Sequence, residues 1–105
     1  IGITVYPPYP AKEFQNMHPY VYQPGGDWTW FGGRMIQALT ENGFIQEAVD
    51  ELAPMTRRVI ANNGFFEWYD VQTGAPKGSG NFRGEAGVLF DAITLLKKWA
   101  INQQK

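Results

Sequence analysis

Apolar side chains recur every three or four residues in three stretches of the chain, which is the spacing of a buried helical face. The first stretch predicts a helix over residues 29–42, the second over 46–62 and the third over 84–102. The positions that set this spacing are Phe31, Met35, Ile36 and Leu39, then Ile45, Ala48, Val49, Leu52, Met55, Val59 and Ile60, and finally Ala86, Leu89, Phe90, Ile93, Leu96 and Ala100. The pattern therefore predicts an all-α chain of three helices.

The residues at the ends of these helices carry further signals. Asp27 or Thr29 is expected to cap the first helix, and Gly43 stands where a left-handed residue ends a helix. Pro54 interrupts the second apolar stripe, and because proline removes a backbone donor we expect a kink or a restart there. Glu85, in the first turn of the third helix, suits the positive end of the helix dipole.

The remaining segments read as loops. Prolines punctuate residues 1–26, although apolar alternation predicts a short strand at residues 1–5. Residues 65–69 (FFEWY) predict a short extended segment, and residues 70–74 (DVQTG) predict a turn. Residues 78–81 predict a tight loop that caps the third helix.

The composition shows that the chain is rich in aromatic residues. Its 105 residues include 4 Trp, 5 Tyr, 7 Phe and 12 Gly, and only 18% are charged. Disordered chains are poor in aromatic residues and rich in charge, so we expect a folded protein. The net charge is -1 and the basic residues form no stripe, so we expect no nucleic-acid partner.

Other chemistries lack the residues they need. There is no cysteine and a single histidine, His18, so we expect no metal site and no cofactor. No apolar run reaches the roughly 18 residues that span a bilayer, so we expect no membrane partner.

Two segments combine carboxylates, rings and glycines, as a sugar-binding site does. Glu67 is flanked by aromatic residues, which partly remove a carboxylate from water and suit it to proton transfer. The alternative is a Glu67 that points to solvent from a half-buried strand. The run 27–30 (DWTW) follows two glycines and offers rings for stacking, or else its rings are core and Asp27 is only a cap.

Three segments resemble motifs of (α/α)6-barrel, or six-hairpin, carbohydrate enzymes. Residues 22–30 (YQPGGDWTW) resemble Y-x-N/x-G-G-x-W, and residues 66–74 (FEWYDVQTG) resemble E-x-Y-D-x-x-T-G. Residues 78–89 (GSGNFRGEAGVL) are similar to F-x-G-W/S-x-A-G-x-L. Their order and spacing resemble the C-terminal quarter of glycoside hydrolases of the trehalase, processing α-glucosidase and neutral invertase superfamily, and of related debranching enzymes and phosphorylases.

The resemblance implies helical hairpins from an incomplete (α/α)6 toroid with long aromatic loops. Residues 1–26 would be loop and residues 27–105 helical, together forming the C-terminal part of a larger catalytic domain. The implied activity is inverting cleavage of glycosidic bonds, with Glu67 as general base and the general acid outside this chain. The residues implied to bind the carbohydrate substrate are Asp27, Trp28, Trp68, Tyr69 and Arg83.

The chain departs from the pattern at Glu85, where relatives carry Trp or Ser, and at Pro24, where many carry Asn. Glu85 is therefore an alternative base. A closed barrel needs far more helices than three, so we expect the remainder of the barrel or self-association to cover the helices, and the chain alone to be inactive. The alternatives are a non-catalytic carbohydrate-binding or helical interaction module and a glycoside phosphorylase.

Overall fold

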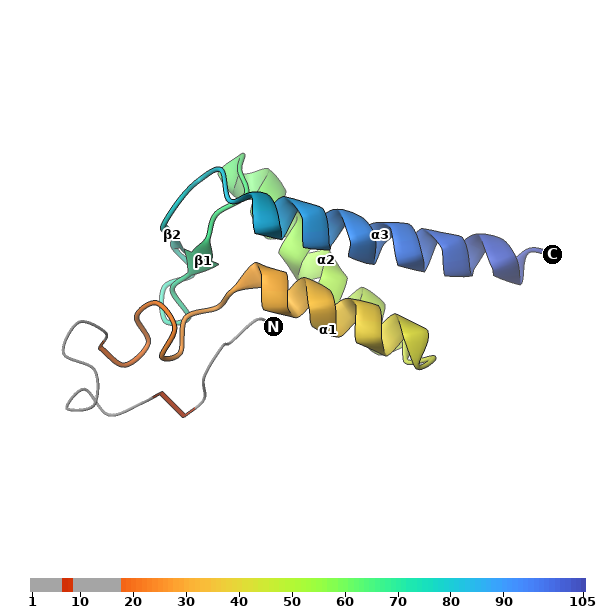
Figure 1. The fold of residues 1–105 in the computed structure, drawn as a ribbon, viewed down its shortest axis with the longest axis horizontal. Coiled ribbons are helices and arrows are strands. Elements are labelled where there is room, and N and C mark those ends of the chain that lie inside the picture. Colours follow the sequence, from red (N-terminus) through yellow and green to blue (C-terminus); the bar gives the residue numbers. More distant parts are fainter. Residues whose placement is uncertain (1–6, 9–17) are drawn as a thin grey trace.

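The computed structural model of the protein describes residues 7–8 and 18–105, and this part of the chain is mainly helical (Figure 1). Its elements in chain order are α1 (Thr29–Glu41), α2 (Ile45–Asn62), β1 (Trp68–Tyr69), β2 (Pro76–Lys77) and α3 (Arg83–Gln103). The three predicted helices are confirmed, each end within one residue of the expected position. The strand predicted at residues 1–5 lies outside the described residues.

The helices pack around a small apolar core. α1 and α3 both run away from the β1–β2 hairpin, and α2 runs back toward it (Figure 1). The buried core residues are Ile36, Ala48, Met55, Leu89, Ala92 and Leu96. Five of the six belong to the predicted apolar stripes, and Ala92 follows Leu89 by three residues on the same face of α3. Burial of these helix faces holds the bundle together. The first residues of α1 and α3 thereby lie at the same end of the molecule as the hairpin.

The starts of α1 and α3 differ from the expected caps. Trp28 precedes α1 in the N-cap position, and no side chain caps the helix. The predicted cap at Asp27 or Thr29 is wrong because both side chains bind Arg58 instead. α3 likewise begins after Phe82 without a side-chain cap, so the capping loop predicted at residues 78–81 is also wrong.

The other helix signals give one confirmation and one correction. Gly43 follows the last residues of α1 with φ +84°, the left-handed conformation that glycine adopts without steric cost. α2 continues through Pro54, so the predicted restart is absent. Pro54 is exposed, and water can therefore bond the backbone oxygen that loses its partner where proline has no N–H.

The extended segment and turn predicted after α2 form the β1–β2 hairpin. Its antiparallel pairs are Trp68 with Lys77 and Tyr69 with Pro76. Asp27 extends this pairing on the other side, because its backbone N–H donates to the Tyr69 oxygen at 3.0 Å and its oxygen accepts from the Tyr69 N–H at 2.8 Å. The chain just before α1 is thus joined to β1.

Asp70 organises the turn between the two strands. Its Oδ1 accepts hydrogen bonds from the backbone N–H groups of Gln72 at 2.8 Å and Thr73 at 3.0 Å. These backbone donors favour the ionised carboxylate and hold the pKa of Asp70 below its ordinary value. The turn is therefore built from a local side-chain contact, as its sequence predicts.

Candidate functional site

An open cavity of about 320 Å³ lies where the segment before α1, the segment before β1 and the start of α3 meet. Its lining residues are Tyr22, Gln23, Trp28, Trp30, Phe31, Glu67 and Phe82. Five of these seven residues are aromatic, and Glu67 is the only carboxylate among them. Such a cavity offers flat apolar surfaces together with one acidic group.

The buried ring of Trp28 holds the aromatic lining together. It meets Tyr22 edge-to-face with ring centroids 4.8 Å apart, and Phe82 with centroids 6.1 Å apart. Its indole Nε1–H donates to the backbone oxygen of Tyr22 at 3.2 Å. Edge-to-face packing and a satisfied indole N–H are the contacts that fix a buried tryptophan in one orientation.

Glu67 is held by the loop that follows β2. Its backbone N–H donates to the Ser79 oxygen at 2.8 Å, and its Oε2 accepts from the Ser79 N–H at 3.2 Å. Gly78 has φ +70°, and a Cβ there would collide with the Glu67 carboxylate. This glycine therefore provides both the backbone conformation and the space that Glu67 needs.

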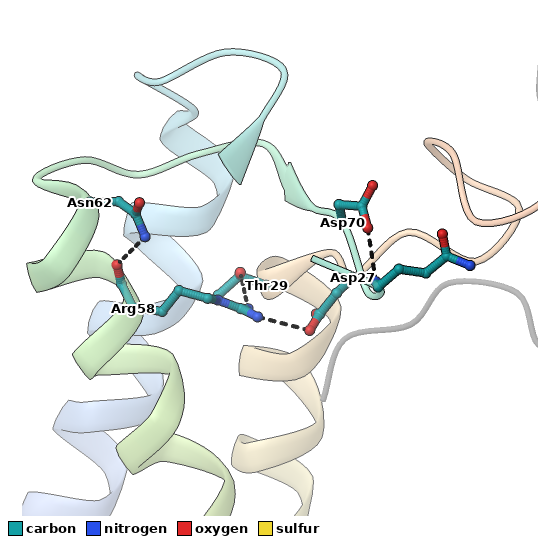
Figure 2. Close-up of polar contacts among 6 residues, drawn as sticks. Asp27, Thr29, Arg58, Asn62 and Asp70 are labelled. Carbon is teal, nitrogen blue, oxygen red and sulfur yellow. Dashed lines mark hydrogen bonds and ion pairs between the residues drawn. The ribbon is translucent and has the colours of Figure 1, made fainter. Parts of the chain in front are cut away.

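Arg58, from α2, forms a cluster beside the cavity (Figure 2). Its Nη1 donates to Asp27 Oδ2 at 2.9 Å and its Nη2 donates to Thr29 Oγ1 at 3.0 Å. The guanidinium carbon lies 3.8 Å from the centroid of the Tyr69 ring, in cation–π contact. One cation thereby joins the last turns of α2, the start of α1 and β1.

Glu85 is buried in the same region. Its side chain has no exposed surface, and neither carboxyl oxygen has a hydrogen-bond partner within the described residues. Burial raises the pKa of Glu85 to about 7, while the nearby Thr29 hydroxyl and the Arg58 charge lower it and Asp27 raises it. Within the described segments, Asp27 Oδ1, Arg58 Nε and the Tyr69 hydroxyl are also buried without partners.

The structure places four of the six predicted site residues in two groups and leaves out Arg83 and Trp68. Glu67 and Trp28 line the cavity. Asp27 and Tyr69 belong to the Arg58 cluster, and their backbones pair with each other. Arg83 is exposed at the start of α3 and is not among the residues that line the cavity.

Trp68 is buried below the lining residues. Its ring meets Tyr22 edge-to-face with centroids 6.2 Å apart, and only 8% of its surface is exposed. It supports a lining residue without lining the cavity itself. This is a packing role, whereas the resemblance implied direct substrate contact.

Sequence reasoning missed Arg58. Beside Arg57 it reads as half of a solvated basic pair, and Arg57 is indeed exposed. A signal was nevertheless present, because Arg58 follows buried Met55 by three residues and so lies next to the inward face of α2.

In the part of the chain that the structure describes, no three His, Asp or Glu side chains lie close enough together to bind a metal ion. Among the helices of that part, none combines the length and apolarity of a membrane span.

The sequence matches no known protein-family model, and comparison with curated proteins and with solved structures found no significant similarity. The residues of the site themselves indicate what it can bind. Aromatic faces can stack on the apolar C–H faces of a sugar ring, and a carboxylate can accept hydrogen bonds from hydroxyl groups or a proton from water.

Proposed function

We propose that the cavity binds a carbohydrate and that Glu67 acts there as the general base of an inverting glycoside hydrolase of the (α/α)6 type. The observation that carries the proposal is the cavity itself, in which five aromatic rings surround one carboxylate. The chain would form one part of the toroid, and a carboxylic acid from another part would complete the site.

In this reaction Glu67 would carry out one proton transfer. Glu67 takes a proton from a water molecule, whose oxygen attacks the anomeric carbon while the second carboxyl group protonates the departing oxygen. Inverting enzymes keep the two carboxyl groups about 6.5–9.5 Å apart to make room for that water. Glu67 suits this role better than Glu85, because Glu67 lines the cavity and Glu85 is buried away from it.

The exposed helix surfaces support the toroid. Ile60 on α2 is 77% exposed and Phe90 on α3 is 68% exposed, and Ile101 on α3 is also exposed. Large apolar side chains on several helices are what neighbouring helices of a toroid would cover.

The test compares Glu67→Gln with the wild-type protein at full length on a panel of glucose-containing disaccharides. We expect turnover to fall by about 100-fold or more, because glutamine cannot accept the proton, while the affinity for the sugar is retained. Glu41→Gln, at an exposed carboxylate in α1, is the matched control and should keep full turnover. Unchanged turnover in Glu67→Gln contradicts the assignment, and turnover that requires phosphate identifies a phosphorylase instead.

One observation favours a second candidate, a non-catalytic carbohydrate-binding module. Among the described residues only one carboxylate lines the cavity, whereas acid–base hydrolysis needs two. Calorimetric titration of the 105-residue chain with the same sugars tests it. Tight stoichiometric binding by this chain alone, with no turnover at full length, favours the module.

A further inference from the structure

We propose that Arg58 is the positioning residue of the aromatic cavity, holding Trp28 and the segment of Glu67 in place from the α2 side. Arg58 would hold the cavity in shape whatever the cavity binds. The effect of Arg58 on sugar binding rests on the proposed function. No residue of α2 lines the cavity. Arg58 therefore acts on the cavity indirectly, through the residues that it binds.

The first contact pair flanks Trp28. Arg58 Nη1 binds the Asp27 carboxylate at 2.9 Å and Arg58 Nη2 binds the Thr29 hydroxyl at 3.0 Å (Figure 2). Asp27 and Thr29 are the chain neighbours of Trp28 on either side. A planar guanidinium has several donors in a fixed fork, so it can hold both neighbours at a set spacing, which a lysine ammonium cannot reproduce.

The second contact reaches the segment that carries Glu67. The Arg58 guanidinium stacks on the Tyr69 ring at 3.8 Å, and the Tyr69 backbone pairs with that of Asp27. Tyr69 follows Glu67 by two residues in the same extended segment. One guanidinium therefore contacts side chains next to Trp28 and in the segment that carries Glu67.

Burial and charge make this contact strong. The Arg58 and Asp27 side chains are only 24% and 16% exposed, so water competes weakly for their ion pair. The buried Glu85 carboxyl of α3 lies close enough for the charges of Arg58 and Asp27 to act on it. A lysine or an apolar residue at position 58 would leave at least one of these groups without its partner.

The test follows the indole N–H signals of the tryptophans in the ¹⁵N-labelled 105-residue chain, without any sugar. We expect Arg58→Met to shift the Trp28 indole signal and to speed its hydrogen exchange by about tenfold or more, the loss equivalent to one charge-assisted hydrogen bond. Arg58→Lys should give an intermediate exchange rate, because the charge remains but the fork is lost. The exposed neighbour provides the control, since Arg57→Met should leave the Trp28 signal unchanged. Trp99, which is partly exposed on α3, is the internal reference and should not respond.

A Trp28 signal and exchange rate in Arg58→Met equal to those in Arg57→Met overturn the proposal. If Arg58→Met loses its helical circular dichroism, Arg58→Lys and Asp27→Asn decide, and wild-type Trp28 exchange in both overturns it. Titration of the full-length wild type with the disaccharide panel separates the two proposals. Faster Trp28 exchange in Arg58→Met sustains the positioning role, and a full-length wild type that binds no sugar contradicts the proposed function alone.

Discussion

Gly33 in α1 lies directly against Val88 in α3, so closely that a Cβ at Gly33 would come within 2.5 Å of Val88 Cγ1. Beside this contact, Gln37 Nε2 donates across the same interface to the Val88 backbone oxygen at 3.1 Å. The absence of a side chain at Gly33 therefore lets α1 and α3 approach closely at this point.

Gly33→Ala should destabilise the protein although alanine is the better helix former. Valine is stiff about χ1, so the added methyl group must push the helices apart, at a cost of about 1–3 kcal/mol in the free energy of unfolding. Gly87→Ala in α3 is the control, because a Cβ there meets nothing within 4 Å. It should stabilise by up to about 1 kcal/mol. Urea unfolding measures both, and equal effects of the two substitutions would contradict the close packing.

Gly78→Ala should impair Glu67, whereas Gly74→Ala should not. Both glycines have a left-handed φ, +70° and +75°, so both substitutions carry the backbone strain of about 1–2 kcal/mol. Only at Gly78 would the new methyl group collide with the Glu67 carboxylate, since a Cβ at Gly74 meets nothing within 4 Å. We expect similar losses in urea unfolding but lower turnover only for Gly78→Ala. Equal turnover in the two variants would show that the collision leaves Glu67 in place.

The helices could be predicted from the sequence because their apolar stripes follow the helical period, and the structure buries part of each stripe in the core. The starts of the helices could not. Asp27 and Thr29 are good capping residues, but both side chains bind Arg58, which is distant in the sequence. A tertiary ion pair thus replaces the local cap, and no residue next to Asp27 or Thr29 in the sequence indicates this contact.

The site could be predicted in part, because some of its residues lie close together in the sequence. Rings and glycines near Glu67 indicated a cavity, and Glu67 lines one. Glu85 was expected to suit the start of a helix or to serve as an alternative base, and a first-turn carboxylate is favourable whether or not it is exposed. Its burial brings it within electrostatic reach of Thr29, Arg58 and Tyr69, which are far from it in sequence.

The turn at Asp70 can be tested directly by titration. The amide signals of Gln72 and Thr73 should move with the ionisation of Asp70, with a midpoint below its ordinary pKa of 3.8, because both N–H groups bond to its ionised Oδ1. The contribution of this contact to stability is present above pH 3.8 and is lost as the pH falls through the lower midpoint. Asp70→Asn should abolish the titration of both signals. Midpoints at or above 3.8 would show that the turn is open in solution.

Glu85 should make the stability of the protein fall as the pH rises from 4.5 to about 7. In this range the folded chain keeps a proton on the buried carboxyl, whose pKa is about 7, while the unfolded chain releases it near 4.5. Unfolding then releases a proton, so rising pH favours the unfolded state, by about 3 kcal/mol over the whole range. The groups that act on this carboxyl are Thr29, Arg58 and Asp27, and Tyr69 stays neutral here because burial raises its pKa above 10.0.

Comparison with Glu85→Gln isolates this contribution, because glutamine has the same shape and does not titrate. The other titrating groups are common to both proteins, so they largely cancel in the difference between their free energies of unfolding. That difference should move by about 3 kcal/mol in favour of the variant between pH 4.5 and pH 8, measured by urea unfolding at each pH. The same comparison with Glu41→Gln, at an exposed carboxylate, should give a nearly constant difference. If the wild-type and Glu85→Gln stabilities stay parallel over this range, the folded and unfolded chains release the Glu85 proton at the same pH, which contradicts a raised pKa in the folded protein.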